Sequence, residues 1–132
     1  MRTSKRTAAA VLASGVALAS LSMVTAPAEA KGREVTRVGS CSGAAHTELK
    51  VKTDNGRLEV EGEVDSNRNG QTWRWRIRHD GAVAARGTRQ THAPSGSFSV
   101  SRRIANHAGQ DHVVFRARNV GSGQVCRTVV NF

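Results

Sequence analysis

Hydrophobic and cationic residues alternate without a break along residues 73–78, in the order Trp-Arg-Trp-Arg-Ile-Arg. This period of two is typical of a strand with one buried face and one solvent-exposed face. Trp73, Trp75 and Ile77 are therefore expected in a core, and the arginines between them are expected at the surface. We interpret this segment as the central strand of a small all-β domain.

Six further segments show alternating patterns bounded by turn residues such as Asn-Gly and Asp-Gly. The seven expected strands cover residues 47–53, 57–65, 73–79, 82–91, 97–104, 112–119 and 124–132. Seven short strands at near-regular spacing, without a helical period, predict a seven-stranded antiparallel immunoglobulin-like β-sandwich. The predicted core contains Trp73, Trp75, Ile77, Phe98, Val100, Val113 and Phe115. Gly62 interrupts the inner face of the second strand, which indicates a bulge or a close backbone approach.

The first thirty residues have the pattern of a secretory signal peptide. Residues 2–6 carry three cations, residues 8–24 are rich in Ala and Leu, and Ala28-Glu29-Ala30 is a small-x-small cleavage site. A membrane anchor is the alternative, but the apolar run is short and diluted by serine against the roughly 20 residues that a spanning helix needs. We therefore expect cleavage after Ala30, a secreted protein, and no membrane span in the mature chain.

The mature chain is long enough for one domain. Residues 31–40 carry cations without periodicity and are expected to form a flexible basic lead, and residues 41–132 are expected to form the sandwich. The leader holds three of the 20 Lys and Arg and one of the 10 Asp and Glu, so the mature chain has a net charge of +8. Most of its cations are arginines, which bind carboxylate, sulfate and phosphate with two parallel hydrogen bonds.

Cys41 and Cys126 are the two cysteines of the chain. In a secreted protein such a pair is expected to form a disulfide, and a metal site at this separation is not favoured. Cys41 precedes the first expected strand and Cys126 lies near the start of the last. The bridge would therefore place the starts of these two strands side by side, with the parallel pairing that closes immunoglobulin-type sandwiches.

Several spaced motifs of the mature chain resemble a family of small secreted actinomycete proteins. These motifs are Cys41-Ser42-Gly43, Asn69-Gly70-Gln71-Thr72-Trp73, Ser95-Gly96-Ser97-Phe98-Ser99-Val100 and Gly121-x-Gly123-x-Val125-Cys126. The resemblance implies an immunoglobulin-like β-sandwich. It implies no activity, and it therefore assigns no catalytic residue.

Two stripes of opposite charge flank the loop before the central strand. The second strand carries Glu59, Glu61 and Glu63 outward, and the central strand carries Arg74, Arg76 and Arg78 outward. If the two strands form a hairpin, the stripes pair and leave no net patch, each pair contributing only about 0.2–1 kcal/mol. In immunoglobulin topology the central strand instead lies beside the sixth strand. We favour this second arrangement because of the cysteine positions.

The favoured arrangement gathers five arginines on one sheet face as a candidate anion-binding site: Arg74, Arg76, Arg78, Arg116 and Arg118. A secreted basic face could bind anionic envelope or extracellular polymers, with an affinity that falls as salt rises. Sequence-specific nucleic-acid binding is not expected, because the aromatic residues fall mostly at core positions.

No catalytic motif accompanies these charges. The chain has no serine elbow, no phosphate-binding glycine loop and no recognised metal spacing, and its five histidines are expected to be scattered on the surface. We therefore expect a non-enzymatic binding module without cofactor or metal. The alternative is an inhibitor or modulator of a secreted enzyme, in which an Arg-bearing loop, residues 66–70, enters a trypsin-like protease. A small hydrolase is the least favoured class.

Overall fold

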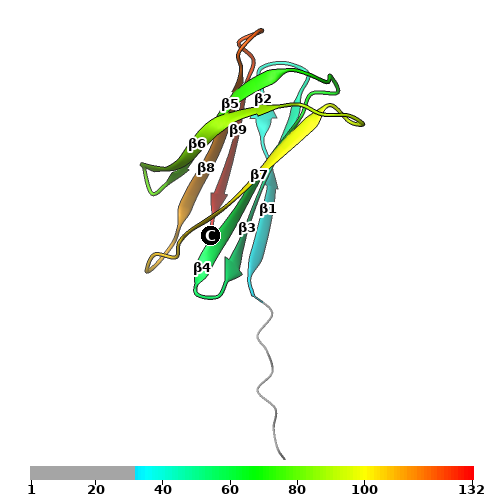
Figure 1. Cartoon of the computed structure of the whole chain (residues 1–132). Coiled ribbons are helices and arrows are strands. Elements are labelled where there is room, and N and C mark those ends of the chain that lie inside the picture. The colour runs from blue at the N-terminus through cyan, green and yellow to red at the C-terminus, as the bar shows by residue number, and fades with distance from the viewer. Residues whose placement is uncertain (1–31) are drawn as a thin grey trace, which may run out of the picture.

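The computed structural model of the chain describes residues 32–132, so the expected signal peptide lies outside the described residues. The described chain consists of strands and the turns that join them (Figure 1). The nine strands are β1 (Glu34–Val38), β2 (Ser40–Cys41), β3 (His46–Asp54), β4 (Arg57–Asp65), β5 (Thr72–His79), β6 (Ala82–Gln90), β7 (Ser97–Ala105), β8 (His112–Asn119) and β9 (Val125–Asn131). No helix of the described residues is long and apolar enough to cross a membrane.

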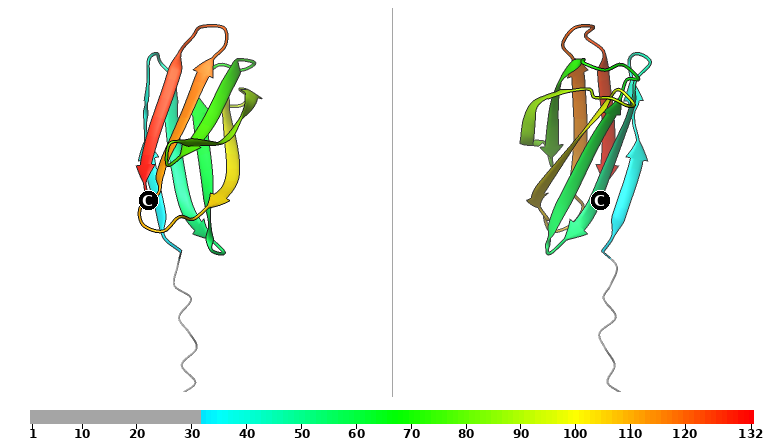
Figure 2. Two further views of the ribbon diagram at one scale, coloured as in Figure 1. Left: turned by 90° about the vertical axis from the view of Figure 1, so that its left-hand side faces the viewer. Right: turned by 45° about the vertical axis from the view of Figure 1, so that its right-hand side comes forward.

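The strands form two antiparallel sheets that pack as a sandwich (Figures 1 and 2). One sheet has four strands in the order β1-β3-β4-β7, and the other has five in the order β2-β9-β8-β5-β6. All seven residues of the predicted core are buried between the sheets, with Trp73, Ile77 and Phe115 fully shielded from solvent. The period-two alternation produces this arrangement because every second side chain of a strand points to the same face.

The expected flexible lead is ordered from Glu34 onward, and the sandwich has nine strands instead of seven. Residues 34–38 form β1, which pairs antiparallel with β3, and Val35 packs against the core beside its partner Val51. The pattern was hard to recognise because the other residues of β1 are mostly exposed. One inward valine and a ladder of backbone hydrogen bonds suffice to order the segment.

The expected parallel pairing of the first and last strands is wrong. The disulfide between Cys41 and Cys126 is present, but it joins β2 to β9, and these strands pair antiparallel. The chain changes sheets at Gly39, between β1 and β2. A Cβ atom at Gly39 would lie 2.3 Å from the carbonyl oxygen of Arg127, so only glycine permits this close crossing.

Gly62 marks a close approach and not a bulge. Its register with β3 and β7 is regular, and a Cβ atom there would lie 2.6 Å from the ring of Phe115 on β8. Because Gly62 has no side chain, β4 leaves room for the ring of Phe115, which β8 inserts into the core.

Candidate anion-binding face

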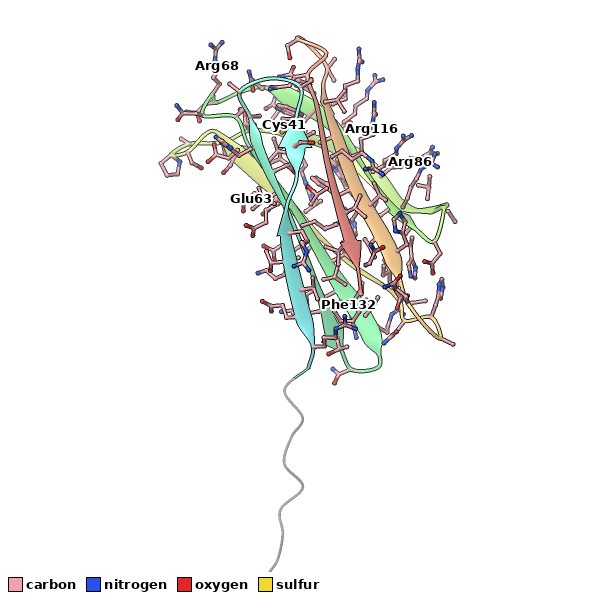
Figure 3. All side chains as sticks on the ribbon, turned by 180° about the vertical axis from the view of Figure 1, so that it is seen from behind. Cys41, Glu63, Arg68, Arg86, Arg116 and Phe132 are labelled. Carbon is pink, nitrogen blue, oxygen red and sulfur yellow. A yellow bond between two sulfur atoms is a disulfide. The ribbon has the colours of Figure 1, made fainter. Side chains whose placement is uncertain are left out.

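The position of β5 in the five-stranded sheet decides which of the two charge arrangements is present. β5 pairs with β6 on one side and with β8 on the other, whereas β4 lies between β3 and β7 in the opposite sheet. The glutamate stripe of β4 and the arginine stripe of β5 therefore lie on different sheets. Figure 3 shows this separation, with Arg86 and Arg116 on the side of the sandwich away from Glu63.

The register of the five-stranded sheet aligns four arginines in one row across it. Arg76 is paired with Arg86 on β6 and with Arg116 on β8, and Arg116 is paired in turn with Arg127 on β9. Arg74 and Arg118 form a second cross-strand pair along the same face. We call the whole set the basic face; it comprises Arg74, Arg76, Arg78, Arg86, Arg116, Arg118 and Arg127.

Arg86 and Arg127 were not among the predicted anion-binding residues. Arg127 alternates with the buried residues Cys126 and Thr128, which is an outward signal that could have been recognised. Arg86 was harder to assign because β6 is an exposed edge strand without a clear inner face. Its register with Arg76, which only the structure supplies, places it on the basic face.

No carboxylate neutralises the basic face within its own sheet. The five strands of this sheet contain eight arginines and no Asp or Glu, whereas seven of the nine Asp and Glu of residues 32–132 lie on strands of the other sheet. The ion pairs of these residues involve Lys50, Lys52, Arg103 and histidines, and none involves an arginine of the basic face.

The guanidinium groups at the centre of the face are partly desolvated. Burial, with the neighbouring charges of Arg78 and Arg116, holds the pKa of Arg76 below its usual value. The Nε atoms of Arg76 and Arg78 are buried and have no hydrogen-bond partner in the described chain. Unpaired buried donors cost free energy, so the packing of these two arginine stems carries a penalty.

The basic face is hollowed on both sides of the central row. One hollow of about 470 Å³ is bordered by Arg74, Arg86 and Arg118, and another of about 330 Å³ is bordered by Arg78 and Arg127. Arg76 and Arg116 contribute to both. The two hollows therefore lie side by side on the basic face, and the side chains of Arg76 and Arg116 border both.

The loop that would enter a protease under the alternative inhibitor hypothesis, residues 66–70, is held by internal hydrogen bonds. The Oγ1 atom of Thr91 donates to the carbonyl oxygen of Arg68 at 2.5 Å, and Ser66 bonds to the carbonyl of Gly96 at 3.1 Å. The side chain of Arg68 is exposed, but its carbonyl group is turned inward. An inhibitory loop must present that carbonyl to the nucleophile of the protease.

The prediction that the five histidines are scattered on the surface is wrong. His79 and His107 stack with ring centroids 4.0 Å apart, and Asp80 and Asp111 contact them. His46 and His92 lie apart from this group and are exposed, whereas His112 has an exposed ring but follows Asp111 and donates its backbone N–H to Asp80. Sequence spacing gave little sign of the group because it joins the end of β5 to the loop before β8.

Comparisons with known proteins add no family to this description. The family resemblance of the spaced motifs therefore stays a prediction. No protein-family model, curated protein or solved structure was found to match this chain.

Proposed function

We propose that the protein is a secreted, non-enzymatic module that binds anionic polymers through the basic face. The observation that carries the proposal is the in-register row of four arginines in a sheet without a single carboxylate on its strands. Like charges directly opposite each other on neighbouring strands destabilise a sheet. An external anion bound between these arginines would offset the repulsion that no carboxylate of the sheet offsets.

The dimensions of the face favour a polymer over a single small anion. Neighbouring strands are about 4.8 Å apart, so a row across four strands extends roughly 14 Å. This length exceeds that of one phosphate or sulfate group and matches a chain with repeated charges. All five aromatic residues of residues 32–132 are buried, which leaves no exposed ring for base stacking. Recognition therefore depends on charge and spacing, and candidate ligands are wall polymers of the teichoic type, acidic polysaccharides and extracellular DNA.

Binding to long-chain polyphosphate, used as the probe, tests the proposal. We expect log K to fall linearly with log salt concentration, because the arginines displace counterions. The double variant Arg76→Gln/Arg116→Gln should bind more weakly, with a salt slope smaller by about two. The control Lys50→Gln/Lys52→Gln removes the same charge from the other sheet, where each lysine pairs with a glutamate. Equal loss of affinity in both variants would show that net charge alone attracts the polymer, and the basic face would then have no special role.

The alternative function, inhibition of a trypsin-like protease, receives less support. The exposed side chain of Arg68 suits the specificity pocket of such an enzyme, but its carbonyl oxygen is held by Thr91. We expect that titrating trypsin with this protein leaves the activity of trypsin unchanged.

We also propose that the sandwich is immunoglobulin-like. The five-stranded sheet, in which β5 lies beside β8 and β8 beside β9, supports it. The four-stranded sheet departs from the pattern, because β3 and β4 form a hairpin within one sheet. Secretion is supported by the leader sequence and by the disulfide.

A further inference from the structure

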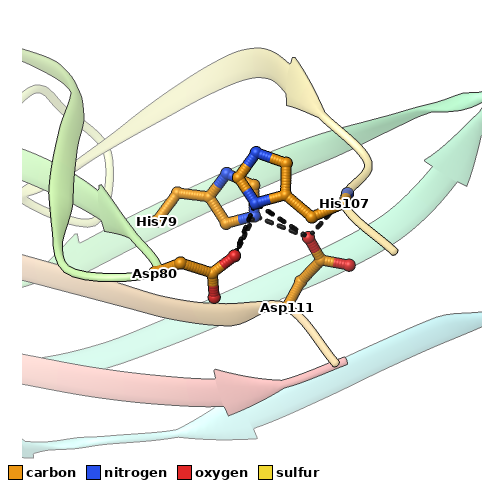
Figure 4. A group of neighbouring side chains, drawn as sticks. All are labelled: His79, Asp80, His107 and Asp111. Carbon is orange, nitrogen blue, oxygen red and sulfur yellow. Dashed lines mark hydrogen bonds and ion pairs between the residues drawn. The ribbon is translucent and has the colours of Figure 1, made fainter. Parts of the chain in front are cut away.

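Two histidines and two aspartates from distant parts of the chain converge at one end of the sandwich (Figure 4). His79 and Asp80 lie where β5 ends, and His107 and Asp111 lie in the loop between β7 and β8. We call these four residues the His–Asp cluster. They lie at the end of the sandwich opposite the disulfide, since Asp111 exchanges backbone hydrogen bonds with Phe132, whereas Cys126 lies near the start of β9.

One ligand atom of each residue faces a common point. His79 Nε2 lies 2.6 Å from Asp111 Oδ1 and 3.4 Å from Asp80 Oδ2. His107 Nδ1 lies 2.5 Å from Asp80 Oδ2 and 4.0 Å from Asp111 Oδ1. All four atoms lie within 4.8 Å of one another. Ligand atoms about 2.0–2.1 Å from a tetrahedral zinc ion are roughly 3.3 Å apart. Each of the four distances given above would therefore change by less than about 1 Å to reach this value.

The carboxylates of the cluster are held in position by other groups. The backbone N–H of His112 donates to Asp80 Oδ1 at 2.8 Å, which leaves Oδ2 facing the two imidazoles. The backbone N–H of His107 donates to Asp111 Oδ1 at 3.0 Å, and the amide of Asn106, oriented with its nitrogen inward, reaches Oδ2 at 3.3 Å. Hydrogen bonds of this kind orient the ligands in protein metal sites.

Burial divides the cluster into an inner and an outer pair. The side chains of Asp111 and His79 are 1% and 6% exposed, whereas those of Asp80 and His107 are 34% and 48% exposed. An ion would therefore enter from the solvent side, past the outer pair, and complete its coordination on the inner pair. The neighbouring hollow is also lined by Arg57 and Arg103, and the latter is paired with Asp54 at 3.0 Å.

The chemistry of the four ligands selects a class of ion. Two carboxylates and two neutral imidazoles carry a charge of −2, which a divalent cation neutralises. Imidazole nitrogen favours zinc and its first-row neighbours, whereas Ca²⁺ and Mg²⁺ prefer oxygen ligands only. Four protein ligands leave no open position, which is the arrangement of a structural zinc site.

From this convergence of four ligand atoms we propose that the His–Asp cluster binds one divalent transition-metal ion, with zinc as the ion of choice. The ion joins the turn after β5 to the loop before β8, and it crosslinks the sandwich at the end opposite the disulfide. The proposal does not depend on the basic face.

Calorimetric titration of zinc chloride into the untagged, chelator-treated protein tests this site. We expect one zinc ion per chain, a higher melting temperature with zinc, and no comparable effect of calcium. Cobalt(II) should give the visible absorption of a four-coordinate ion. The variant His107→Ala, which removes an exposed ligand, should weaken zinc binding at least about tenfold. Asp80→Asn, which keeps an acceptor for the backbone of His112, should weaken it as well.

The control is His46→Ala, which removes an exposed histidine on β3 outside the cluster. It should bind zinc as the unchanged protein does. The absence of binding at one equivalent would overturn the proposal, and so would equal zinc affinities of His107→Ala and His46→Ala. Melting curves without metal establish that each variant is folded, so that a loss of binding is assigned to the missing ligand.

Discussion

Replacing Arg76 with glutamine should make the folded protein more stable and should at the same time weaken its binding of polyanions. Arg76 occupies the centre of the arginine row, with Arg86 opposite it on β6 and Arg116 opposite it on β8. Its Nε atom is buried without a partner. Glutamine keeps the side-chain stem as far as Cδ and removes the positive charge, while its neutral amide takes the place of Nε.

The size of the effect follows from the register. Each of the two like-charged cross-strand pairs costs about 0.2–1 kcal/mol. Because the neighbouring side chains are partly or fully exposed, solvent screening keeps the sum near the low end, and the shorter stem loses some packing. We expect a net gain of roughly 0.2–0.5 kcal/mol at low salt. For a domain of this size the melting temperature would rise by about 1–3 °C.

Thermal unfolding at about 10 mM and about 1 M salt measures the effect, because the screening length falls from roughly 30 Å to 3 Å between these conditions. The gain should be largest at low salt and nearly absent at high salt. Arg57→Gln serves as the control, since Arg57 faces Asp54 across the β3–β4 pair and its removal should lower stability slightly. If Arg76→Gln is no more stable than the unchanged protein at low salt, or if the gain persists at high salt, the repulsion argument is wrong.

Three further predictions concern stability. Gly62→Ala should destabilise the fold by about 1–3 kcal/mol in urea unfolding, because the new methyl group meets the ring of Phe115; adding Phe115→Leu should cost less than the sum of the two changes, and strict additivity would contradict the contact. Reducing the disulfide, whose cysteines are 85 residues apart, should cost about 4–5 kcal/mol, and an unchanged melting temperature would refute this. Burial, with the charge of Glu48, raises the pKa of Glu63. The ionised form therefore opposes folding above that pKa, so Glu63→Gln should add a few tenths of a kcal/mol at pH 7. This gain should fade as the pH falls through the raised pKa, and a gain that is constant with pH would contradict the assignment.

The strands could be predicted from the sequence because their alternation is local. Each of the seven expected segments forms a strand, and the indole rings of Trp73 and Trp75 lie in the core. Arg102 shows where local reasoning ends. It occupies an inward position opposite Val60, yet it lies over the ring of Trp75, 5.0 Å from the centroid. The alternation of β7 places Arg102 on the inner face with Val100 and Ile104, but it does not show that the guanidinium group packs on Trp75.

The candidate sites depend on pairings that the sequence left open. The two possible neighbours of β5 were distinguished by an argument from the cysteines, which favoured the correct neighbour although the parallel pairing that accompanied it is wrong. Arg86 joins the basic face only through its register with Arg76, whereas the alternation of β9 already turns Arg127 outward. The His–Asp cluster depends on a contact between His79 and Asp111, 32 residues apart, and two loops had to be placed before that contact could be recognised.

The separation of charge between the two sheets gives the molecule an electric dipole across its thickness. The glutamates of β4 lie on one sheet and the basic face lies on the other, with the sheets about 10 Å apart. Near any negatively charged surface the electric field exerts a torque on this dipole, which turns the five-stranded sheet toward the surface before contact is made. Adsorbed molecules then share one orientation and present their acidic strand to the medium, so that the first layer of protein partly restores the charge it has covered.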